Sequence, residues 1–260
     1  MRGKRGWGTC NSVMFRAFAI AALSTAAPVL AQDGPPTGAP GGFAISGEAV
    51  LLTDYRFRGV SRSDEDPAAQ AALTLSHGSG FYTGARATTL KGIDPFRARD
   101  PGFGDLGDVQ FDLYAGWRAD LGGGFDLDAG VLYYAFAGSE GATDYVESYA
   151  SVSWLIGPAQ LTGGAKYAPA QDGTGGEDML YLFGQADVTV PFRPWSFTAQ
   201  AGRQDWGAFG AYWTWSLGVQ HHLQVPGLPY TELGLRYVDT DLPSTRGQDG
   251  GLIASLSVRF

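Results

Sequence analysis

The sequence predicts an all-β protein: a transmembrane, antiparallel, up-and-down β-barrel of about 12 strands, with short periplasmic turns and longer extracellular loops. Three observations lead to this fold class. Apolar and polar residues alternate with period two along most of the chain, and the connections between the alternating segments are alternately short and long. Aromatic residues also gather near both ends of the apolar faces.

Composition excludes several other classes of protein. The 260 residues have a mean hydropathy of −0.09, and no apolar run of about 18 residues follows residue 31, which excludes a polytopic helical membrane protein. The 39 glycines disfavour helices, and aromatic residues at 13% are too frequent for a disordered chain. A net charge of −8 with only three lysines, Lys4, Lys91 and Lys166, argues against nucleic acid as a partner.

The N-terminal segment is expected to be an export signal. Basic residues near the start precede an apolar stretch at 17–30, so we expect residues 1–31 to form a secretory signal peptide cleaved after Ala31. A membrane anchor is the alternative, for which this stretch is short. Residues 32–42, rich in Gly and Pro, are expected to form a flexible leader, and residues 43–260 the barrel.

Alternation is clearest at 108–118, where Val109 and Phe111 begin an apolar face opposite Asp108 and Asp112. A strand places such neighbours on opposite sides of a sheet. The sequence predicts twelve strands of this kind, at 44–58, 68–77, 80–90, 108–118, 125–137, 144–156, 159–168, 178–190, 196–206, 212–223, 229–239 and 250–260.

The connections differ between the two rims of the predicted barrel. Short turns such as 78–79 and 157–158 follow the even-numbered strands, whereas longer polar links follow the odd-numbered strands. This asymmetry, with an even number of strands, is typical of outer-membrane barrels. The sequence leaves open whether the long link at 91–107 folds into the lumen.

The aromatic residues decide which face of each strand meets lipid. A soluble sandwich or lipocalin-like barrel also alternates, but its apolar face points inward, and such a core has no reason to collect aromatic side chains at both rims. Two aromatic girdles therefore favour the membrane barrel. We expect Phe81, Trp117, Phe125, Trp154, Phe197 and Phe260 near the short-turn rim, and Tyr55, Phe57, Tyr133, Tyr167, Trp213 and Tyr237 near the long-loop rim.

One block of sequence carries a family resemblance. The residues TDYRFRGVS at 53–61, followed by Ser63-Asp64 and by DPAAQ at 66–70, resemble the TorF family of proteobacterial porins. Shorter and less specific fragments of similar sequence follow in the same order, among them SGFYTG at 79–84 and YVDTD at 237–241. The resemblance implies an outer-membrane β-barrel of the porin kind.

The expected partners belong to the outer membrane. The terminal Phe260 closes an alternating strand and resembles the C-terminal signal by which the barrel-assembly machinery recognises its substrates. Outer-membrane lipid would surround the wall. Asp64, Glu65 and Asp66 could hold divalent cations beside lipopolysaccharide, although plain solvation is the usual state of such a run.

If the apolar residues face lipid, the opposite faces line a polar lumen with nine acidic and seven basic residues. We therefore expect passive diffusion of small hydrophilic solutes or ions with a weak cation preference, or else a closed structural or adhesive barrel. The acidic residues expected in the lumen are Glu48, Asp54, Asp108, Asp112, Asp126, Asp128, Glu147, Asp187 and Glu232. The basic residues expected there are Arg56, Arg58, Arg86, Arg118, Lys166, Arg236 and Arg259.

Arg56 and Arg58 are the most specific candidates, because they share the inward face of the first predicted strand with Asp54 inside the family-like block. Two interpretations stay open. The three residues form a constriction or binding cluster, or they form a salt-bridged plug that holds the lumen together.

The sequence gives little support to cofactor binding or catalysis. The GFGDLG segment at 102–107 matches a dinucleotide-binding pattern, but a strand follows it where that site requires a helix, so no cofactor is expected. His77, His221 and His222 all map to the short-turn rim, and no Asn follows residue 31. A membrane hydrolase with a Ser-His-Asn or Ser-His-Asp site is therefore not expected.

Overall fold

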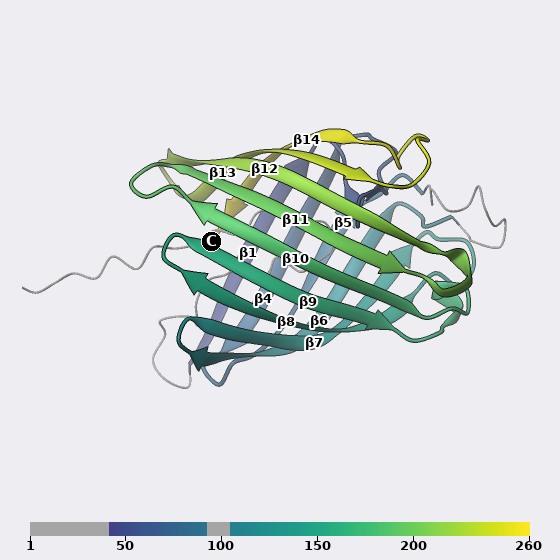
Figure 1. Cartoon of the computed structure of the whole chain (residues 1–260), viewed down its shortest axis with the longest axis horizontal. Helices are drawn as coiled ribbons and strands as arrows, with labels where there is room; N and C mark the ends of the chain where they lie inside the picture. The colour runs from purple at the N-terminus through teal and green to yellow at the C-terminus, as the bar shows by residue number, and fades with distance from the viewer. Residues whose placement is uncertain (1–41, 93–104) are drawn as a thin grey trace, which may run out of the picture.

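The structure is a computed structural model, and it describes residues 42–92 and 105–260. The expected signal peptide at 1–31, the leader at 32–42 apart from Gly42, and most of the 91–107 link lie outside the described residues. Twelve antiparallel strands form a closed barrel, as the sequence predicts (Figure 1). No helix in the described part of the chain has the length and apolarity needed to cross a membrane.

Each barrel strand pairs with its neighbours in sequence, and β1 pairs with β14 to close the sheet, from Glu48 opposite Arg259 to Leu52 opposite Ser255. The barrel strands are β1 (Phe43–Leu52), β4 (Ala68–His77), β5 (Phe81–Thr89), β6 (Val109–Gly122), β7 (Phe125–Ala137), β8 (Tyr145–Ile156), β9 (Ala159–Ala168), β10 (Met179–Thr189), β11 (Trp195–Asp205), β12 (Ala211–Val225), β13 (Leu228–Thr240) and β14 (Gly251–Arg259). Two short 3₁₀ turns, η1 (Asp172–Thr174) and η2 (Gly207–Phe209), lie in the loops.

The two rims of the barrel differ as expected. Turns such as 157–158 and 226–227 join strands at one end, while loops such as 169–178 and 241–250 gather at the other. Figure 1 shows the C-terminus at the end with the short turns. These ends are called the short-turn end and the long-loop end below.

The wall has an apolar outer face and a mainly polar inner face. On β12, for example, Trp215 and Leu217 are exposed on the outside, whereas Thr214 and Ser216 are buried inside. A water-soluble barrel has the reverse arrangement, because its apolar residues fill the core. The outer face therefore suits lipid.

One predicted strand is wrong in its second half. The segment 44–58 was expected to run along the wall, but β1 ends at Leu52, where Thr53 donates its backbone N–H to the Ala254 carbonyl at 3.0 Å. The chain then turns into the lumen and forms a small antiparallel pair, β2 (Arg56–Phe57) and β3 (Val60–Ser61). A strand inside the lumen alternates with the same period as one in the wall, so alternation alone could not separate them.

Because of this turn, two aromatic residues that were predicted to face lipid in the girdles lie elsewhere. Tyr55 and Phe57, expected to face lipid near the long-loop end, are buried in the lumen. The other ten aromatic residues expected in the girdles are exposed on the outer surface, including Trp117 and Phe125 near the short-turn end and Trp213 and Tyr237 near the long-loop end.

The predicted position of Asp108 in the lumen is also wrong. It was expected to begin a strand and face the lumen, but β6 begins at Val109, and Asp108 is exposed in the preceding loop. Its backbone N–H donates to the Ala137 carbonyl at 3.1 Å, which fixes the loop against the end of β7.

Because the outer face of β12 is apolar, the loss of stability caused by a charged substitution should depend on its position along this strand. Leu217 lies near the middle of this strand and is exposed, so Leu217→Arg should lower the free energy of unfolding in lipid vesicles by about 2–4 kcal/mol. Val225→Arg, at the end of the same strand, should cost no more than about 1 kcal/mol. Urea titrations of the refolded variants measure both values, and equal small losses would contradict a bilayer-spanning wall.

Candidate functional site

The lumen near the long-loop end is filled by residues 53–67, which we call the inward hairpin. It contains β2 and β3, and its backbone is closed by the Arg62 N–H donating to the Tyr55 carbonyl at 2.7 Å. Arg56 and Arg58 are only 2% and 1% exposed. The hairpin is therefore an element of the barrel interior rather than a loop over its rim.

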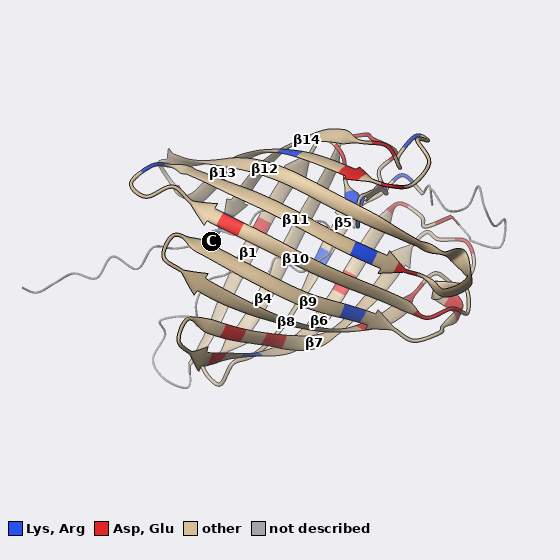
Figure 2. Cartoon of the chain, in the orientation of Figure 1, with Lys and Arg blue, Asp and Glu red and all other residues tan. Residues whose placement is uncertain are grey.

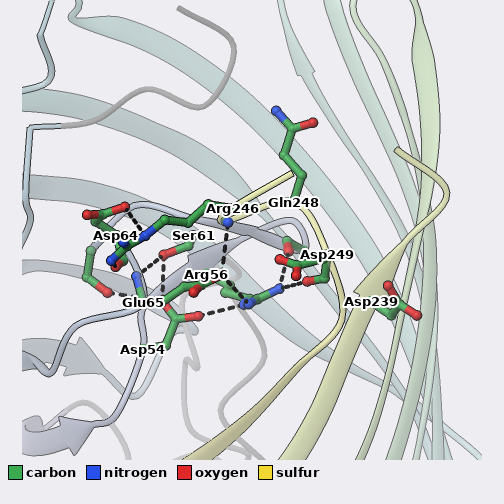
Figure 3. Close-up of polar contacts among 12 residues, drawn as sticks. Asp54, Arg56, Ser61, Asp64, Glu65, Asp239, Arg246, Gln248 and Asp249 are labelled. Atoms are coloured by element: carbon green, nitrogen blue, oxygen red, sulfur yellow. Dashed lines mark hydrogen bonds and ion pairs between the residues drawn. The ribbon is translucent and has the colours of Figure 1, made fainter. Parts of the chain in front are cut away.

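Asp54 organises the base of the inward hairpin (Figure 3). One carboxylate oxygen accepts from Arg56 Nε at 2.6 Å, and the other accepts from the hydroxyl groups of Ser61 at 2.6 Å and Ser63 at 3.1 Å. Arg56 also donates to the Asp249 backbone carbonyl in the 241–250 loop. The buried carboxylate thus joins both strands of the hairpin, and Arg56 joins them to the barrel.

Arg58, at the turn of the hairpin, reaches across the lumen to the opposite wall. Its guanidinium forms an ion pair with Glu147 on β8 and donates to the Gln204 side-chain oxygen on β11 at 2.5 Å. The same group lies 4.8 Å from the centre of the Phe57 ring and 4.7 Å from that of the Tyr181 ring. Burial lowers the pKa of Arg58, but the Glu147 carboxylate together with Tyr134 and Tyr145 raises it above its ordinary value, so the guanidinium stays charged.

Gly59 allows the turn to approach the wall. Its φ is +91°, and a Cβ there would lie 2.4 Å from Thr240 Cγ2 and 2.5 Å from Thr214 Oγ1. No side chain fits this space, so glycine is required at the point where the hairpin meets β12 and β13.

Arg62 fixes the returning arm of the hairpin. Its guanidinium lies 3.6 Å from the Phe57 ring centre and 5.5 Å from that of Phe136 on β7. It also donates to Gln110 on β6 at 2.7 Å, and Gln110 in turn donates to Asp112 at 2.6 Å. The hairpin is therefore tied to walls on both sides of the lumen.

A second set of contacts braces the hairpin from the 241–250 loop. Arg246 forms an ion pair with Asp64 at 2.9 Å (Figure 3). The Gly247 N–H donates to Glu65 at 2.9 Å. Ser61 donates its backbone N–H to the Gly247 carbonyl at 2.7 Å. These contacts hold the loop against the hairpin at the long-loop end.

Backbone strain concentrates in the same segment. Arg58, Asp64 and Glu65 have φ values of 51°, 56° and 61°, and Phe192 is the one other described non-glycine residue with positive φ. Such conformations persist where surrounding contacts impose them, and they cluster at functional sites. The hairpin is thus held in place by its side-chain contacts against a local backbone cost.

The remaining predicted site residues form groups at different levels of the lumen. Arg86, Asp112, Glu147 and Lys166 are buried around the inward hairpin. Towards the short-turn end, Arg118 pairs with Asp128 at 3.2 Å, and Asp126 lies half-buried nearby on β7. Glu232 and Arg236 lie on β13, where the charges of Asp54 and Arg56 act on Arg236.

Sequence reasoning missed Arg62, Gln110 and Gln204 as site residues. Gln110 and Gln204 occupy inward positions of alternating strands, but uncharged side chains were not counted as candidates. Arg62 was assigned to an outer loop because the turn into the lumen was not foreseen. With Asp108 removed and Arg62 added, the set of lumen residues predicted from the sequence has eight acidic and eight basic members, of which Asp54, Arg56, Arg58 and Arg62 belong to the hairpin. No group of three metal-ligating side chains occurs within residues 42–92 and 105–260.

The contacts of Arg58 predict an unequal cost for two ion pairs. Glu147→Gln leaves a buried guanidinium without its countercharge, so the free energy of unfolding should fall by about 3–5 kcal/mol. Lys91→Gln breaks the exposed pair with Asp66 and should cost less than about 1 kcal/mol. Urea unfolding of the refolded variants measures both, and similar losses would show that the Arg58 contact does not fix the hairpin.

Two solved structures share the barrel architecture. One is described as the KdgM porin in complex with disordered oligogalacturonate, with 6% identity, coverage of 83% of this chain and 97% of that chain, and a TM-score of 0.53. The other is the NanC porin, with 13% identity, coverage of 84% and 99%, and a TM-score of 0.53. Likeness at this level of identity shows the porin fold alone. Comparison with curated proteins gives no match.

The sequence itself matches a bacterial family over most of its length. The profile of this family covers residues 36–251, which include the inward hairpin and all of the barrel up to the start of β14. The narrower resemblance to the TorF family stays a prediction. The chain belongs to the family described as "Bacterial protein of unknown function (Gcw_chp)".

Proposed function

We propose that the protein is a passive outer-membrane channel for small hydrophilic solutes or ions, and that the inward hairpin sets its limiting cross-section. The observation that carries this proposal is a charged hairpin crossing a polar lumen inside an apolar wall. Twelve strands enclose a narrower space than the 16 to 18 strands of open porins, so one hairpin is enough to constrict it. The fold shared with two porins supports the proposal.

The expectations about export, lipid and assembly belong to the outer-membrane location that we propose. Residues 1–31 would direct export, and lipid of the outer membrane would surround the wall. Phe260 is 68% exposed at the short-turn end, and its backbone exchanges two hydrogen bonds with Gly47, so its ring is available to the barrel-assembly machinery. Asp64 and Asp66 pair with Arg246 and Lys91, which leaves less charge for divalent cations beside lipopolysaccharide.

The mouth of the barrel supports a weak cation preference better than the wall does. Of the charged residues predicted to line the lumen, seven acidic and five basic ones lie on the described barrel strands, and acidic residues dominate the long-loop end more strongly (Figure 2). The described acidic residues at this end are Asp64, Glu65, Asp66, Asp105, Asp108, Glu140, Asp144, Asp172, Glu177, Asp178, Asp205, Asp239, Asp241 and Asp249. The described basic residues there are Lys91, Arg203 and Arg246. Such a mouth attracts cations over about one Debye length.

A closed structural or adhesive barrel is the second candidate. The specific observation in its favour is that Arg56 and Arg58 are both buried and paired with partners from the hairpin, the wall and the 241–250 loop. A hairpin held this firmly could seal the lumen. Conductance separates the two candidates.

Replacing the hairpin tests the proposed constriction. Leu52 pairs with Ala68 across β1 and β4, so a short Gly-Ser turn in place of residues 54–66 can join these adjacent strands. In planar bilayers, the refolded wild-type protein should show small ion-dependent steps. The variant should show steps several times larger, because the hairpin no longer occupies the lumen.

Shortening the 138–143 link at the same rim is the matched control and should leave the conductance unchanged. Equal steps from wild type and hairpin variant would remove the hairpin as the constriction. Absence of steps from the wild type, with large steps from the hairpin variant, would favour the closed barrel.

The acidic mouth predicts a salt-dependent selectivity. Reversal potentials in KCl gradients should favour potassium at low salt, and the preference should fade towards 1 M, where the Debye length is about 3 Å. Neutralising Glu140, Asp172 and Asp205 as Glu140→Gln, Asp172→Asn and Asp205→Asn should reduce the preference, because all three are exposed at the mouth. The charge-preserving set Glu140→Asp, Asp172→Glu and Asp205→Glu should keep it. A preference for chloride would contradict the proposal.

A further inference from the structure

One arginine faces outward from the barrel wall near the long-loop end. On β11, Gln204 is buried on the lumen side, whereas Arg203 is exposed on the opposite, outer face. Arg203 is the one lysine or arginine on the outer face of the described barrel strands, because the others on those strands face the lumen. A charge on a lipid-facing surface is costly unless it reaches polar groups at the membrane interface. The position of Arg203 therefore requires a partner on the membrane side.

The guanidinium of Arg203 finds no acceptor in the described part of the chain. It makes no hydrogen bond or ion pair there, although Asp205 is exposed two positions further along the same face. It lies instead 5.5 Å from the centre of the ring of Trp213, which is opposite Arg203 in the register of β11 and β12. The five N–H groups of Arg203 are thus available to an acceptor outside the protein.

Trp213 adds a second donor beside this guanidinium. Its backbone N–H donates to the Asp241 carboxylate at 2.7 Å, but its indole N–H has no acceptor among the described residues, and the residue is 47% exposed. By contrast, the hydroxyl of Tyr237 in the same girdle donates to Asp239 at 2.9 Å. Arg203 and Trp213 therefore present adjacent donors to the lipid that surrounds this end of the barrel.

The outer surface next to this pair, towards the middle of the wall, is formed by small residues. Gly163, Gly184 and Ala201 lie side by side on β9, β10 and β11, and Trp215 on β12 follows in the same row. A Cβ at Gly163 or Gly184 would meet no other atom within 4 Å, so this surface is open. Acyl chains can pack against it while a headgroup lies at the depth of the aromatic girdle.

A lipid phosphate supplies the acceptors that the two donors lack. A guanidinium binds two phosphate oxygens in a bidentate contact, which leaves another oxygen for the indole N–H. The long loops of an outer-membrane barrel are extracellular, and the lipid on that side is lipopolysaccharide, whose lipid A carries phosphate groups. The charge, the second donor and the open apolar surface thus match one kind of molecule.

We propose that Arg203 and Trp213 form a binding site for a phosphate group of lipid A. The guanidinium of Arg203 and the indole N–H of Trp213 donate to the phosphate, and the acyl chains lie against Gly184 and Ala201. The proposal rests on the outer-membrane location in the proposed function and is independent of conduction, because the site lies outside the lumen.

A lipid titration followed by native mass spectrometry of the refolded full chain in detergent tests the site without requiring conductance. The probes are lipid A, dephosphorylated lipid A and inorganic phosphate. The wild type should bind lipid A at least about tenfold more tightly than the dephosphorylated lipid, because hydrogen bonds to a charged group contribute this much. Inorganic phosphate in excess should not displace lipid A, because it has no acyl chains.

Two outcomes of this titration would overturn the proposal. Equal binding of the two lipids would show that Arg203 only extends towards water at the interface, as long basic side chains do. Displacement of lipid A by inorganic phosphate would show a simple anion site. The comparison uses the wild type alone, so it holds even if a variant fails to fold.

Substitutions assign the two donors. Arg203→Gln should weaken lipid A about tenfold and remove the preference over the dephosphorylated lipid, whereas Arg203→Lys should retain part of it because it keeps the charge and loses the bidentate contact. Trp213→Phe keeps a ring and removes the N–H, so it should weaken lipid A about threefold.

Lys91→Gln is the matched control, because it removes the same charge from the same end of the barrel, in a loop where Lys91 pairs with Asp66. It should bind lipid A as the wild type does. Equal weakening by Lys91→Gln and Arg203→Gln would show general attraction to the rim and would overturn the assignment to Arg203.

Conductance separates this proposal from the proposed function. Arg203→Gln should leave the ion-dependent steps unchanged, because its side chain faces away from the lumen. A protein that conducts ions and does not distinguish the two lipids retains the channel and loses the site. A protein that binds lipid A through Arg203 and shows no steps retains the site and loses the channel.

Discussion

Closure of the sheet by β1 and β14 is the constraint on which the rest of the structure depends. Every backbone N–H and C=O in a bilayer needs a partner within the protein, and only a closed sheet supplies one for both edges. Closure with twelve strands also fixes the width of the lumen, which side chains can nearly fill. The apolar outer face and the polar inner face then follow from alternation along each strand.

A polar lumen of this width creates a second requirement, which the inward hairpin meets. Charged side chains removed from water need partners, and Asp54, Glu147 and the arginines of the hairpin supply them to one another. Tyr181 and Phe136 add ring faces on which the guanidinium groups stack. The block that carries the family resemblance therefore contains the arginines that join the hairpin to the opposite wall and to the 241–250 loop.

The sequence was sufficient for the fold because the features that specify a barrel are local. Period-two alternation and the length of each connection are visible residue by residue, and they predicted twelve strands and the difference between the rims. The path of 53–67 was not predictable in this way, because Tyr55 and Phe57 alternate with Asp54 and Arg56 whether the segment lies in the wall or in the lumen. Its placement depends on contacts far away in sequence, such as Arg58 with Glu147 and Ser61 with Gly247. For the same reason, the burial of Glu232, whose carboxylate oxygens accept no hydrogen bond within the described residues, appears only once β12, β13 and β14 are placed side by side.

The chemistry of the hairpin contacts bears on whether a filled lumen can still conduct. A plug held by apolar packing would lose buried area on moving, and the cost would rise with every square ångström exposed to water. The inward hairpin buries Tyr55, Phe57 and Val60, but it is also held by ion pairs and hydrogen bonds, whose net contribution is small where water can replace each partner. Its strained residues Arg58, Asp64 and Glu65 gain backbone freedom on release. A polar, strained hairpin in a polar lumen is thus a weaker barrier than its burial alone indicates, which is the physical reason to prefer a constricted channel over a sealed barrel.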